Sequence, residues 1–495
     1  MSAQTYTVEP VQSLLREIDP QHELPPCGLQ RLLLGSNAVS AVSSTVQELL
    51  AAAGRSSPAG DRPRVSLLVD RTPILRSGED LKELVENQLR ERFDVERTVL
   101  DDGQQELHVV EQVLDDASRA ADGADAVVAV GGGTISDIGK VAAQRAGLSG
   151  ERPVLVSVQT AASVDGYTDD VSVVVREGVK RTVPSCWPDG VVADAETIAQ
   201  APARMNRAGF GEMTSMLVAP ADWRLASLVG TDESFRPGPV RLLQVVGEDI
   251  DSWSAGIKDG EPQAVAALTR ALALRGVVTG VAGSTAVLSG MEHLISHMLD
   301  QYHGEKHLPM GLHGAQVGAA SVVAAAAWEM LFERLAADPG RVRIDDAALD
   351  PDEAHSQVRA AFSAVDPTGR IAGECWQDYS AKLRTVTDRR QRIEEVLRAW
   401  PEHRPELQGL IRPSADVAAG LRASGAAATF EELDPHVDRE LARWAVENCA
   451  LMRNRFTVAD MLRLLGWWNE ADVDEVFDRA GRAVSAAEQG GRGSR

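Results

Sequence analysis

The chain has 495 residues, of which 44% are apolar and 25% are charged, so it holds enough apolar material for a buried interior spread over two or three domains. That composition excludes a disordered or fibrous protein. Lys and Arg number 50 and Asp and Glu 73, which gives a net charge of −23. A field of that sign repels polyphosphates and anionic bilayers, so we expect neither nucleic acid nor a membrane as a partner.

The cysteines and the apolar stretches point to a cytoplasmic protein. The four cysteines lack C-x-x-C spacing, so neither a disulfide framework nor a thiolate zinc site is indicated. The first twenty residues have no basic segment before an apolar run, and the uncharged stretch 308–328 contains proline, histidine and glutamine. We therefore expect no export signal and no membrane-spanning helix. The cysteines are Cys27, Cys186, Cys375 and Cys449.

After a polar N-terminal arm, residues 1–27, short apolar runs alternate with helical patterns. The expected strands are 32–35, 65–70, 95–100, 126–130 and 154–158, and the expected helices lie near 46–50, 79–92, 105–121 and 134–146. Short β-rich runs separated by helices are typical of a parallel sheet covered by helices on both faces. The sequence therefore predicts an α/β domain.

The alternation of strand-like runs and helical patterns ends near residue 170. Alternating residues over 171–184 predict a hairpin laid over the end of the sheet. From about residue 200 onward the spacing of apolar residues is helical, with almost no strand signal. We expect an α/β dinucleotide-binding domain at 28–200, an all-helical metal- and substrate-binding domain at 201–486, and a disordered tail at 487–495.

The strongest local motif is a strand that runs into Gly131, Gly132 and Gly133 and then into a helix. Such a turn lets backbone amides approach a phosphate at the positive end of the helix. The pattern is not G-x-G-x-x-G, and a tight turn without a ligand remains the alternative. Asp70 follows an early strand, where it could accept a hydrogen bond from a ribose hydroxyl or simply cap a loop.

Histidines gather in the helical half of the chain. Five of the ten fall between residues 293 and 313. His293 and His297 stand four apart, so one helix face presents both imidazoles, and His313 follows at a helix start. Two imidazoles and a carboxylate would make a catalytic metal site with room for substrate, whereas partly exposed helix histidines are the alternative.

Seven motifs stand in a fixed order along the chain: residues 131–137, 159–167, 178–182, 208–212, 221–225, 289–297 and 313–318. Together they resemble the sn-glycerol-1-phosphate dehydrogenase family, which belongs with the iron-containing alcohol dehydrogenases and dehydroquinate synthases. The resemblance runs from about residue 28 to 466, and residues 452–458 look like the last helices of that family.

The resemblance implies a Rossmann-like N-terminal domain, a helical C-terminal domain and an active site between them. His293 and His313 match metal ligands of the family, with Glu212 at the third ligand position. The expected ion is zinc, with nickel or iron as alternatives. Asp165 and His297 match substrate-contacting positions. The residues that match contacts of NAD or NADP are Gly131, Gly132, Gly133, Thr134, Ser136, Asp137, Thr160 and Ser163.

The chain departs from the family pattern at three positions. Glu212 stands where the dehydrogenases have Asp, whereas dehydroquinate synthases use Glu for this ligand. Asp169 stands where the family has Ser near the cofactor, and Ala315 replaces a Glu. These departures bear on the substrate more than on the fold.

The leading hypothesis is a metal-dependent, NAD(P)-linked dehydrogenase that reduces dihydroxyacetone phosphate or a related phosphorylated ketone. The metal would polarise the ketone oxygen, His297 would relay a proton, and Asp165 would orient a hydroxyl. Asp70 would favour NAD, because a carboxylate repels a 2′-phosphate. Candidates for holding the substrate phosphate are Lys180, Arg181 and Lys306.

Two other functions remain open. Glu212 favours a dehydroquinate-synthase-like cyclase that uses NAD catalytically, and Asp169 and Ala315 suggest a scaffold protein that has lost catalysis. Within the histidine-rich segment, His303 opens a rival H-G-E motif, although we expect His303 and His307 to be exposed loop residues. We also expect a homodimer or a larger homo-oligomer.

Overall fold

The computed structural model describes residues 13, 15–17, 19–55, 62–104, 106–176, 179–247, 249–337 and 342–492. The chain folds into two units. The first unit comprises Met1–Gly209 and Arg241–Gly283, and the second comprises Phe210–Val240 and Ser284–Arg495.

A six-stranded parallel sheet forms the centre of the first unit, as the sequence predicts. Strands β6 and β7 are buried along their whole length, because helices cover both faces of the sheet. The strand order across the sheet is β1 (Arg31–Gly35), β10 (Gly190–Asp194), β7 (Val154–Gln159), β6 (Ala126–Gly131), β2 (Arg64–Val69) and β5 (Asp94–Val99).

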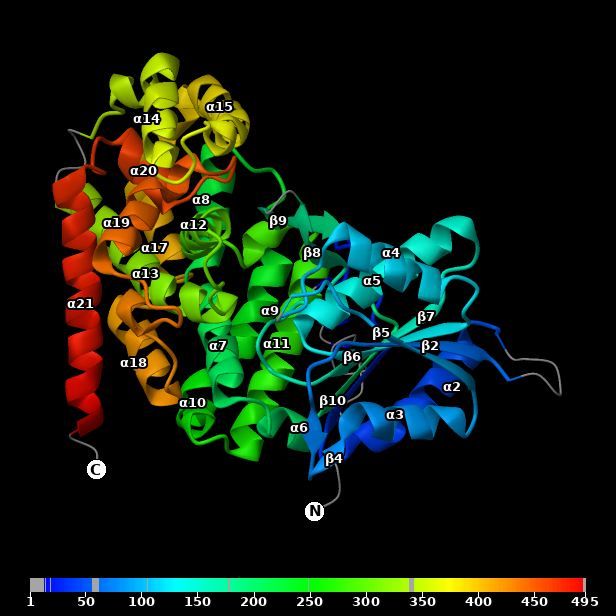
Figure 1. The fold of residues 1–495 in the computed structure, drawn as a ribbon. Coiled ribbons are helices and arrows are strands. Elements are labelled where there is room, and N and C mark those ends of the chain that lie inside the picture. Colours follow the sequence, from blue (N-terminus) through cyan, green and yellow to red (C-terminus); the bar gives the residue numbers. More distant parts are fainter. Residues whose placement is uncertain are drawn as a thin grey trace. The chain divides into compact units, whose positions relative to one another are not determined.

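Two pairs of helices cover the two faces of this sheet (Figure 1). On one face, α2 (Val42–Ala52) and α3 (Leu81–Arg90) pack against alternate strand residues such as Val128. On the other, α4 (Glu111–Ala121) and α5 (Gly133–Ser149) pack against the residues in between. The near-continuous apolar strands follow from this double coverage.

The hairpin predicted for 171–184 is present as the antiparallel pair β8 (Val171–Arg176) and β9 (Val179–Pro184). It packs against α5, where Val174 joins the same apolar cluster. A second antiparallel pair, β3 (Leu75–Arg76) and β4 (Glu79–Asp80), leads into α3. The sequence analysis does not anticipate β10, which lies between β1 and β7.

Several helices beyond residue 200 fold with the first unit, so the units do not follow the boundary expected there. The long helix α11 packs against β1, where Leu32 meets Val277 and Val281 in one apolar cluster. The helices α10 (Ile250–Lys258) and α11 (Pro262–Ala282) lie wholly in the first unit, as does α6 (Ala195–Ala199) before residue 200. The helices α7 (Ala203–Met213) and α9 (Pro237–Gly247) each lie partly in the first unit and partly in the second.

The second unit is helical, and no strand follows β10 in the part of the chain that the structure describes. The last helix runs to Arg492, so most of the tail that was expected to be disordered is helical. The α-helices are α8 (Ala219–Val229), α12 (Met291–Glu305), α13 (His313–Ala337), α14 (Pro351–Ser363), α15 (Arg370–Asp388), α16 (Arg390–Arg398), α17 (Trp400–Gln408), α18 (Ser414–Ser424), α19 (Arg439–Asn448), α20 (Val458–Leu464) and α21 (Glu470–Arg492).

Two helices, α11 and α13, are long and apolar enough to cross a membrane by length and composition alone. Their most apolar windows are 72% and 89% buried inside the protein. Helices that are apolar on all sides and covered by protein are typical core helices. The four cysteines are free thiols in the structure.

Candidate functional site

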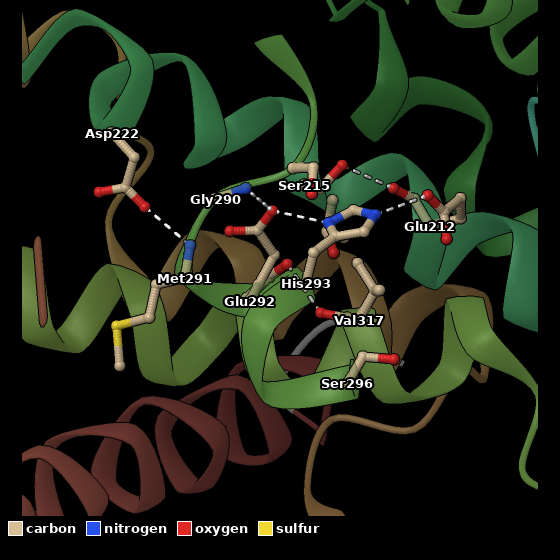
Figure 2. A network of polar contacts seen from close by, with 12 residues as sticks. Glu212, Ser215, Asp222, Gly290, Met291, Glu292, His293, Ser296 and Val317 are labelled. Atoms are coloured by element: carbon tan, nitrogen blue, oxygen red, sulfur yellow. Dashed lines mark hydrogen bonds and ion pairs between the residues drawn. The ribbon is translucent and has the colours of Figure 1, made fainter. Parts of the chain in front are cut away.

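Glu212, His293 and His313 come together in the second unit, carried by α7, α12 and α13. One potential ligand atom from each lies within 4.8 Å of the other two. His293 Nε2 is 3.4 Å from Glu212 Oε1, and His313 Nε2 is 3.8 Å from Glu212 Oε2. Figure 2 shows Glu212 and His293 facing each other. Of the described residues, this is the set that could hold a metal ion.

Glycines allow the helices that carry these ligands to approach closely. A Cβ on Gly211 would lie 2.2 Å from the carbonyl oxygen of Gly314, and one on Gly318 would lie 2.9 Å from the Gly211 Cα. Contacts that short do not occur, so only glycine permits this crossing of α7 and α13. Because Gly211 precedes Glu212 and Gly314 follows His313, the crossing places the two ligands side by side.

The donor set fits a divalent metal. Two ligands bound about 2.0–2.2 Å from a tetrahedral ion lie roughly 3.3–3.6 Å apart, close to the separations found here. Each imidazole has its Nδ1 held by a neighbour: His293 Nδ1 is 2.8 Å from Glu292 Oε1, and His313 Nδ1 is 2.9 Å from Ser296 Oγ. Both Nε2 atoms therefore face Glu212, as in metal sites whose histidines are oriented by outer partners.

Ser296 fixes the tautomer of His313. Its hydroxyl donates to Gln316 Oε1 at 2.7 Å, so its oxygen is left to accept the Nδ1 proton of His313. The unprotonated Nε2 then carries the lone pair that a metal requires. The sequence analysis does not single out Glu292, Ser296 or Gln316, although each stands inside a motif beside a ligand.

The carboxylates of Glu212 and Glu292 raise the pKa of His293. Burial lowers the pKa of His293, but hydrogen bonds with Glu212 and Glu292 outweigh burial and raise the pKa to about 9. In the protein without metal, this raised pKa favours the protonated imidazole. A metal ion must displace that proton in order to bind.

His297 lies beside the ligand histidines. Its ring stacks on that of His313 with centroids 5.7 Å apart, and its centroid is 6.3 Å from that of His293. The expectation that His303 is an exposed loop residue is wrong, because α12 continues to Glu305 and buries the side chain. His307 does lie exposed beyond the helix end.

In the first unit, the glycine turn joins β6 to α5. A Cβ on Gly131 would clash with Ile135 and one on Gly133 with Val164, whereas one on Gly132 would have no described atom within 4 Å. The outer two glycines are thus required by packing, and Gly132 borders open space. Because α5 starts at Gly133, its first amides point toward that space, which suits a diphosphate. Thr134 is half-buried and Ser136 buried.

Lys140 organises the residues that follow this turn. It is fully buried, and its Nζ lies 2.7 Å from Asp169 Oδ1 and 3.2 Å from Asp137 Oδ1. The same ammonium donates to the carbonyl oxygens of Gly166, at 2.6 Å, and Val171. Burial raises the pKa of Asp169 to about 7 despite the opposing effect of Lys140. Contacts of Asp137 and Asp169 with a dinucleotide stay predictions, since both carboxylates face Lys140.

The loop that contains Asp165 is held by α11. Asp165 Oδ2 lies 3.1 Å from an amino nitrogen of Arg275, whose side chain is fully buried. Thr168 donates to the carbonyl oxygen of Ala273 at 2.6 Å. The sequence alone gives no sign of the Arg275 pairing. Thr160 and Ser163, on the same loop, are buried.

Asp70 lies beside the glycine turn but its charge is compensated. The strand pairing puts Val69 opposite Val130, so Asp70 comes level with Gly131 at the carboxyl edge of the sheet. Asp70 Oδ1 accepts a hydrogen bond from Lys82 Nζ at 2.5 Å. The ammonium offsets the charge that would repel a 2′-phosphate.

The expected phosphate-binding side chains belong to different units, so a shared phosphate site stays a prediction. Lys306 donates to the carbonyl oxygen of Ala364 at 3.1 Å, in the second unit. Arg181 lies in β9 of the first unit, and the side chain of Lys180 lies outside the described residues.

Comparison with known proteins shows the family to which the chain is similar. Residues 40–202 match the model of the iron-containing alcohol dehydrogenase family. The chain is 34% identical over 290 residues to the glycerol-1-phosphate dehydrogenase (NAD(P)+) of Natronomonas pharaonis, covering 57% of this chain and 77% of that protein. It is 34% identical over 259 residues to the same enzyme of Haloquadratum walsbyi, covering 52% and 71%.

A solved structure supports the fold. The glycerol dehydrogenase of Schizosaccharomyces pombe is similar with a TM-score of 0.54 and 14% identity, over 93% of this chain and 90% of that chain. At that identity the likeness speaks for the fold alone. The sequence matches carry the assignment: the chain belongs to the glycerol-1-phosphate dehydrogenase family, within the iron-containing alcohol dehydrogenases, and is an oxidoreductase.

Proposed function

We propose that the protein is a metal-dependent, NAD(P)-linked dehydrogenase that reduces dihydroxyacetone phosphate or a closely related phosphorylated ketone. The observation that carries the proposal is the cluster of Glu212, His293 and His313, which offers three protein ligands. A tetrahedral ion held by three ligands has a fourth position that a substrate oxygen could take. Family membership and the names of the relatives support the dinucleotide and the substrate class.

Each group of residues has a separate role in the proposed reaction. When bound, a divalent ion supplies Lewis acidity for the ketone oxygen and a reduced nicotinamide supplies hydride. Glu212, His293 and His313 would hold the ion, and the turn at Gly132 would hold the dinucleotide diphosphate. His297, one helical turn from His293, holds the proton that the new hydroxyl needs.

The direct test measures loss of NADH and NADPH absorbance with a panel of phosphorylated ketones, together with elemental analysis of the same sample. The proposal expects stoichiometric oxidation of the dinucleotide by dihydroxyacetone phosphate or a near relative, and about one divalent ion per chain with three protein ligands. The analysis also decides among zinc, nickel and iron. A sample with one bound ion per chain that oxidises no dinucleotide with any ketone contradicts the dehydrogenase.

A cyclase that uses NAD catalytically is the second candidate, and Glu212 favours it. A cyclase would convert all of its substrate on a trace of NAD, with no second redox partner. Product analysis with catalytic and with stoichiometric dinucleotide separates the two reactions.

The replacement Glu212→Asp is expected to keep the metal and net dinucleotide oxidation, with equal or better use of dihydroxyacetone phosphate, because Asp is the ligand found in the resembling dehydrogenases. In a cyclase, the shorter carboxylate would move the ion by a fraction of roughly 1 Å and lower the rate substantially. Steady-state kinetics and metal content of both forms make the comparison. Glu212→Gln is the matched control, since it keeps the length and removes the charge.

The replacement Lys82→Met is expected to weaken NADPH binding about tenfold more than NADH binding, because Asp70 would regain an uncompensated charge beside the 2′-position. Fluorescence titration gives both dissociation constants. Lys258→Met, at an exposed lysine of the same unit, controls for the change in net charge. Equal weakening of both dinucleotides would remove Asp70 from the ribose site.

The cytoplasmic location and self-association remain proposals. Light scattering on the purified chain measures its mass in solution, and a monomer would contradict the expected homodimer.

A further inference from the structure

Three charged residues from the family-like motifs have no role in the proposed chemistry. They are Asp222 on α8, Glu292 on α12 and Arg455 before α20. In the folded chain, all three contact the short segment that leads into α12, the helix that carries His293. Figure 2 shows Asp222 reaching from another helix to the Met291 amide, and Glu292 between Gly290 and His293.

Glu292 contacts the ligand histidine directly. Its side chain is fully buried, and its Oε1 is 2.8 Å from His293 Nδ1 and accepts a hydrogen bond from the Gly290 amide at 2.8 Å. A carboxylate facing Nδ1 draws the imidazole proton to that nitrogen. The lone pair is then left on Nε2, which faces Glu212.

Asp222 fixes the backbone on which Glu292 and His293 stand. Its Oδ2 accepts a hydrogen bond from the Met291 amide at 2.8 Å. Its Oδ1 accepts from the Val458 amide at 2.8 Å and from Trp328 Nε1 at 3.1 Å. One buried carboxylate thereby joins the start of α12 to α13 and α20.

Arg455 fixes the residues just before the helix. One amino nitrogen donates to both the carbonyl and the hydroxyl oxygen of Ser289, and the other donates to Thr285 Oγ1 at 2.8 Å. The segment between Thr285 and Met291 is thus held from two sides.

Gly290 lets the two carboxylates reach the same stretch of backbone. A Cβ at this position would lie 2.5 Å from Asp222 Oδ2 and 2.9 Å from Glu292 Oε2. Any side chain here would push the carboxylates away from their amides. The glycine of this motif is therefore explained by the arrangement around it.

We infer that Glu292 is a positioning residue that holds His293 in the tautomer and orientation required of a metal ligand, while Asp222 and Arg455 fix the backbone that carries both residues. The inference rests on the proposed metal centre and extends it to residues that do not touch the ion. Outer partners of ligand histidines typically change metal affinity 10- to 100-fold when they are replaced.

The test is Glu292→Gln, which keeps the shape of the side chain and removes its charge. Competition with a chelator is expected to show metal binding about 10- to 100-fold weaker than in the parent. The visible absorption spectrum of the cobalt(II)-loaded variant is expected to shift, because the ligand field changes when His293 loses its carboxylate partner. A purely structural role would leave that spectrum unchanged.

Asp366→Asn is the matched control. Asp366 is a buried carboxylate of the same unit that accepts hydrogen bonds from the amides of Thr368 and Ile371, at 2.8 and 3.0 Å. Its replacement is expected to lower the melting temperature and to leave the chelator titration and the cobalt spectrum as in the parent.

The outcomes separate this inference from the proposed function. If His293→Ala keeps its metal, the metal centre itself is misassigned. If His293→Ala loses its metal while folded Glu292→Gln binds metal and absorbs like the parent, the positioning role is overturned. Should Glu292→Gln fail to fold, Glu292→Asp is tested in the same way, because its carboxylate is withdrawn from Nδ1 while its charge is kept.

Discussion

Replacing His293 with alanine is expected to remove the bound metal and to lower kcat/KM by about 10³-fold or more. The variant lacks one of three protein donors, and the two that remain, Glu212 and His313, do not make a stable site. Elemental analysis after gel filtration and steady-state rates with dihydroxyacetone phosphate measure the two losses.

His297→Asn provides the control for that experiment. The His297 ring lies against that of His313 but is not one of the three grouped ligands. The variant is expected to keep its metal while its rate falls about 10²- to 10⁴-fold, the range for loss of a general acid. Stoichiometric metal in His293→Ala would show that the ligand assignment is wrong.

Replacing Lys140 with methionine is expected to lower the free energy of unfolding by about 3–5 kcal/mol, because it leaves the buried carboxylate of Asp169 and the partly buried one of Asp137 without their shared cation. The ammonium also holds the carbonyl oxygens of Gly166 and Val171, so the loop loses two further hydrogen bonds. Urea denaturation of the parent and the variant measures the difference.

The effect depends on pH with a definite sign. Burial raises the pKa of Asp169 from its ordinary value of 3.8 to about 7 in the folded protein. Between those values the folded state holds a proton that the unfolded chain has released, so the free energy of unfolding falls as pH rises. The Lys140 ammonium lowers the pKa of Asp169, so this pKa rises further when the ammonium is removed. The free energy of unfolding then continues to fall up to a higher pH. The variant should therefore lose more stability at about pH 8 than at about pH 5.5.

The double variant Lys140→Met/Asp169→Leu tests the pairing. Replacing both partners by apolar groups of similar size is expected to cost less than Lys140→Met alone, because one fewer charge is left buried. Losses that simply add would show that Lys140 and Asp169 act independently.

Much of the fold follows from local sequence patterns. The strands β2, β6 and β7 are apolar runs between helices of clear periodicity, and the structure confirms them. Strand β10 is harder to predict, since it has five residues, Gly190–Asp194, and follows a hairpin. Its place between β1 and β7 depends on pairing with segments far away in the chain. The placement of α10 and α11 in the first unit is hard to predict for the same reason. It depends on contacts between distant segments, such as the packing of α11 on β1, which leave no local pattern in the sequence.

The residues of the candidate site can be predicted from the sequence, but their contacts cannot. The sequence motifs name Glu212, His293 and His313, and the structure brings these three together. What the sequence does not reveal is the partner of each polar group. Lys140 stands in the glycine motif, but its contact with Asp169 depends on how the loop folds back. His303 is wrongly expected to be an exposed loop residue because the sequence gives no sign that α12 continues as far as Glu305.

The bonds of Asp222 also bear on how the second unit moves. The amide protons of Met291 and Val458 end on the same carboxylate, although they belong to segments far apart in the chain. A local opening that frees one amide also disturbs the acceptor of the other, so the two segments form a single cooperative unit. A fluctuation at the start of α20 is thereby transmitted to the helix that carries His293. Slow exchange of both amides with solvent, with one shared protection factor, would be its signature.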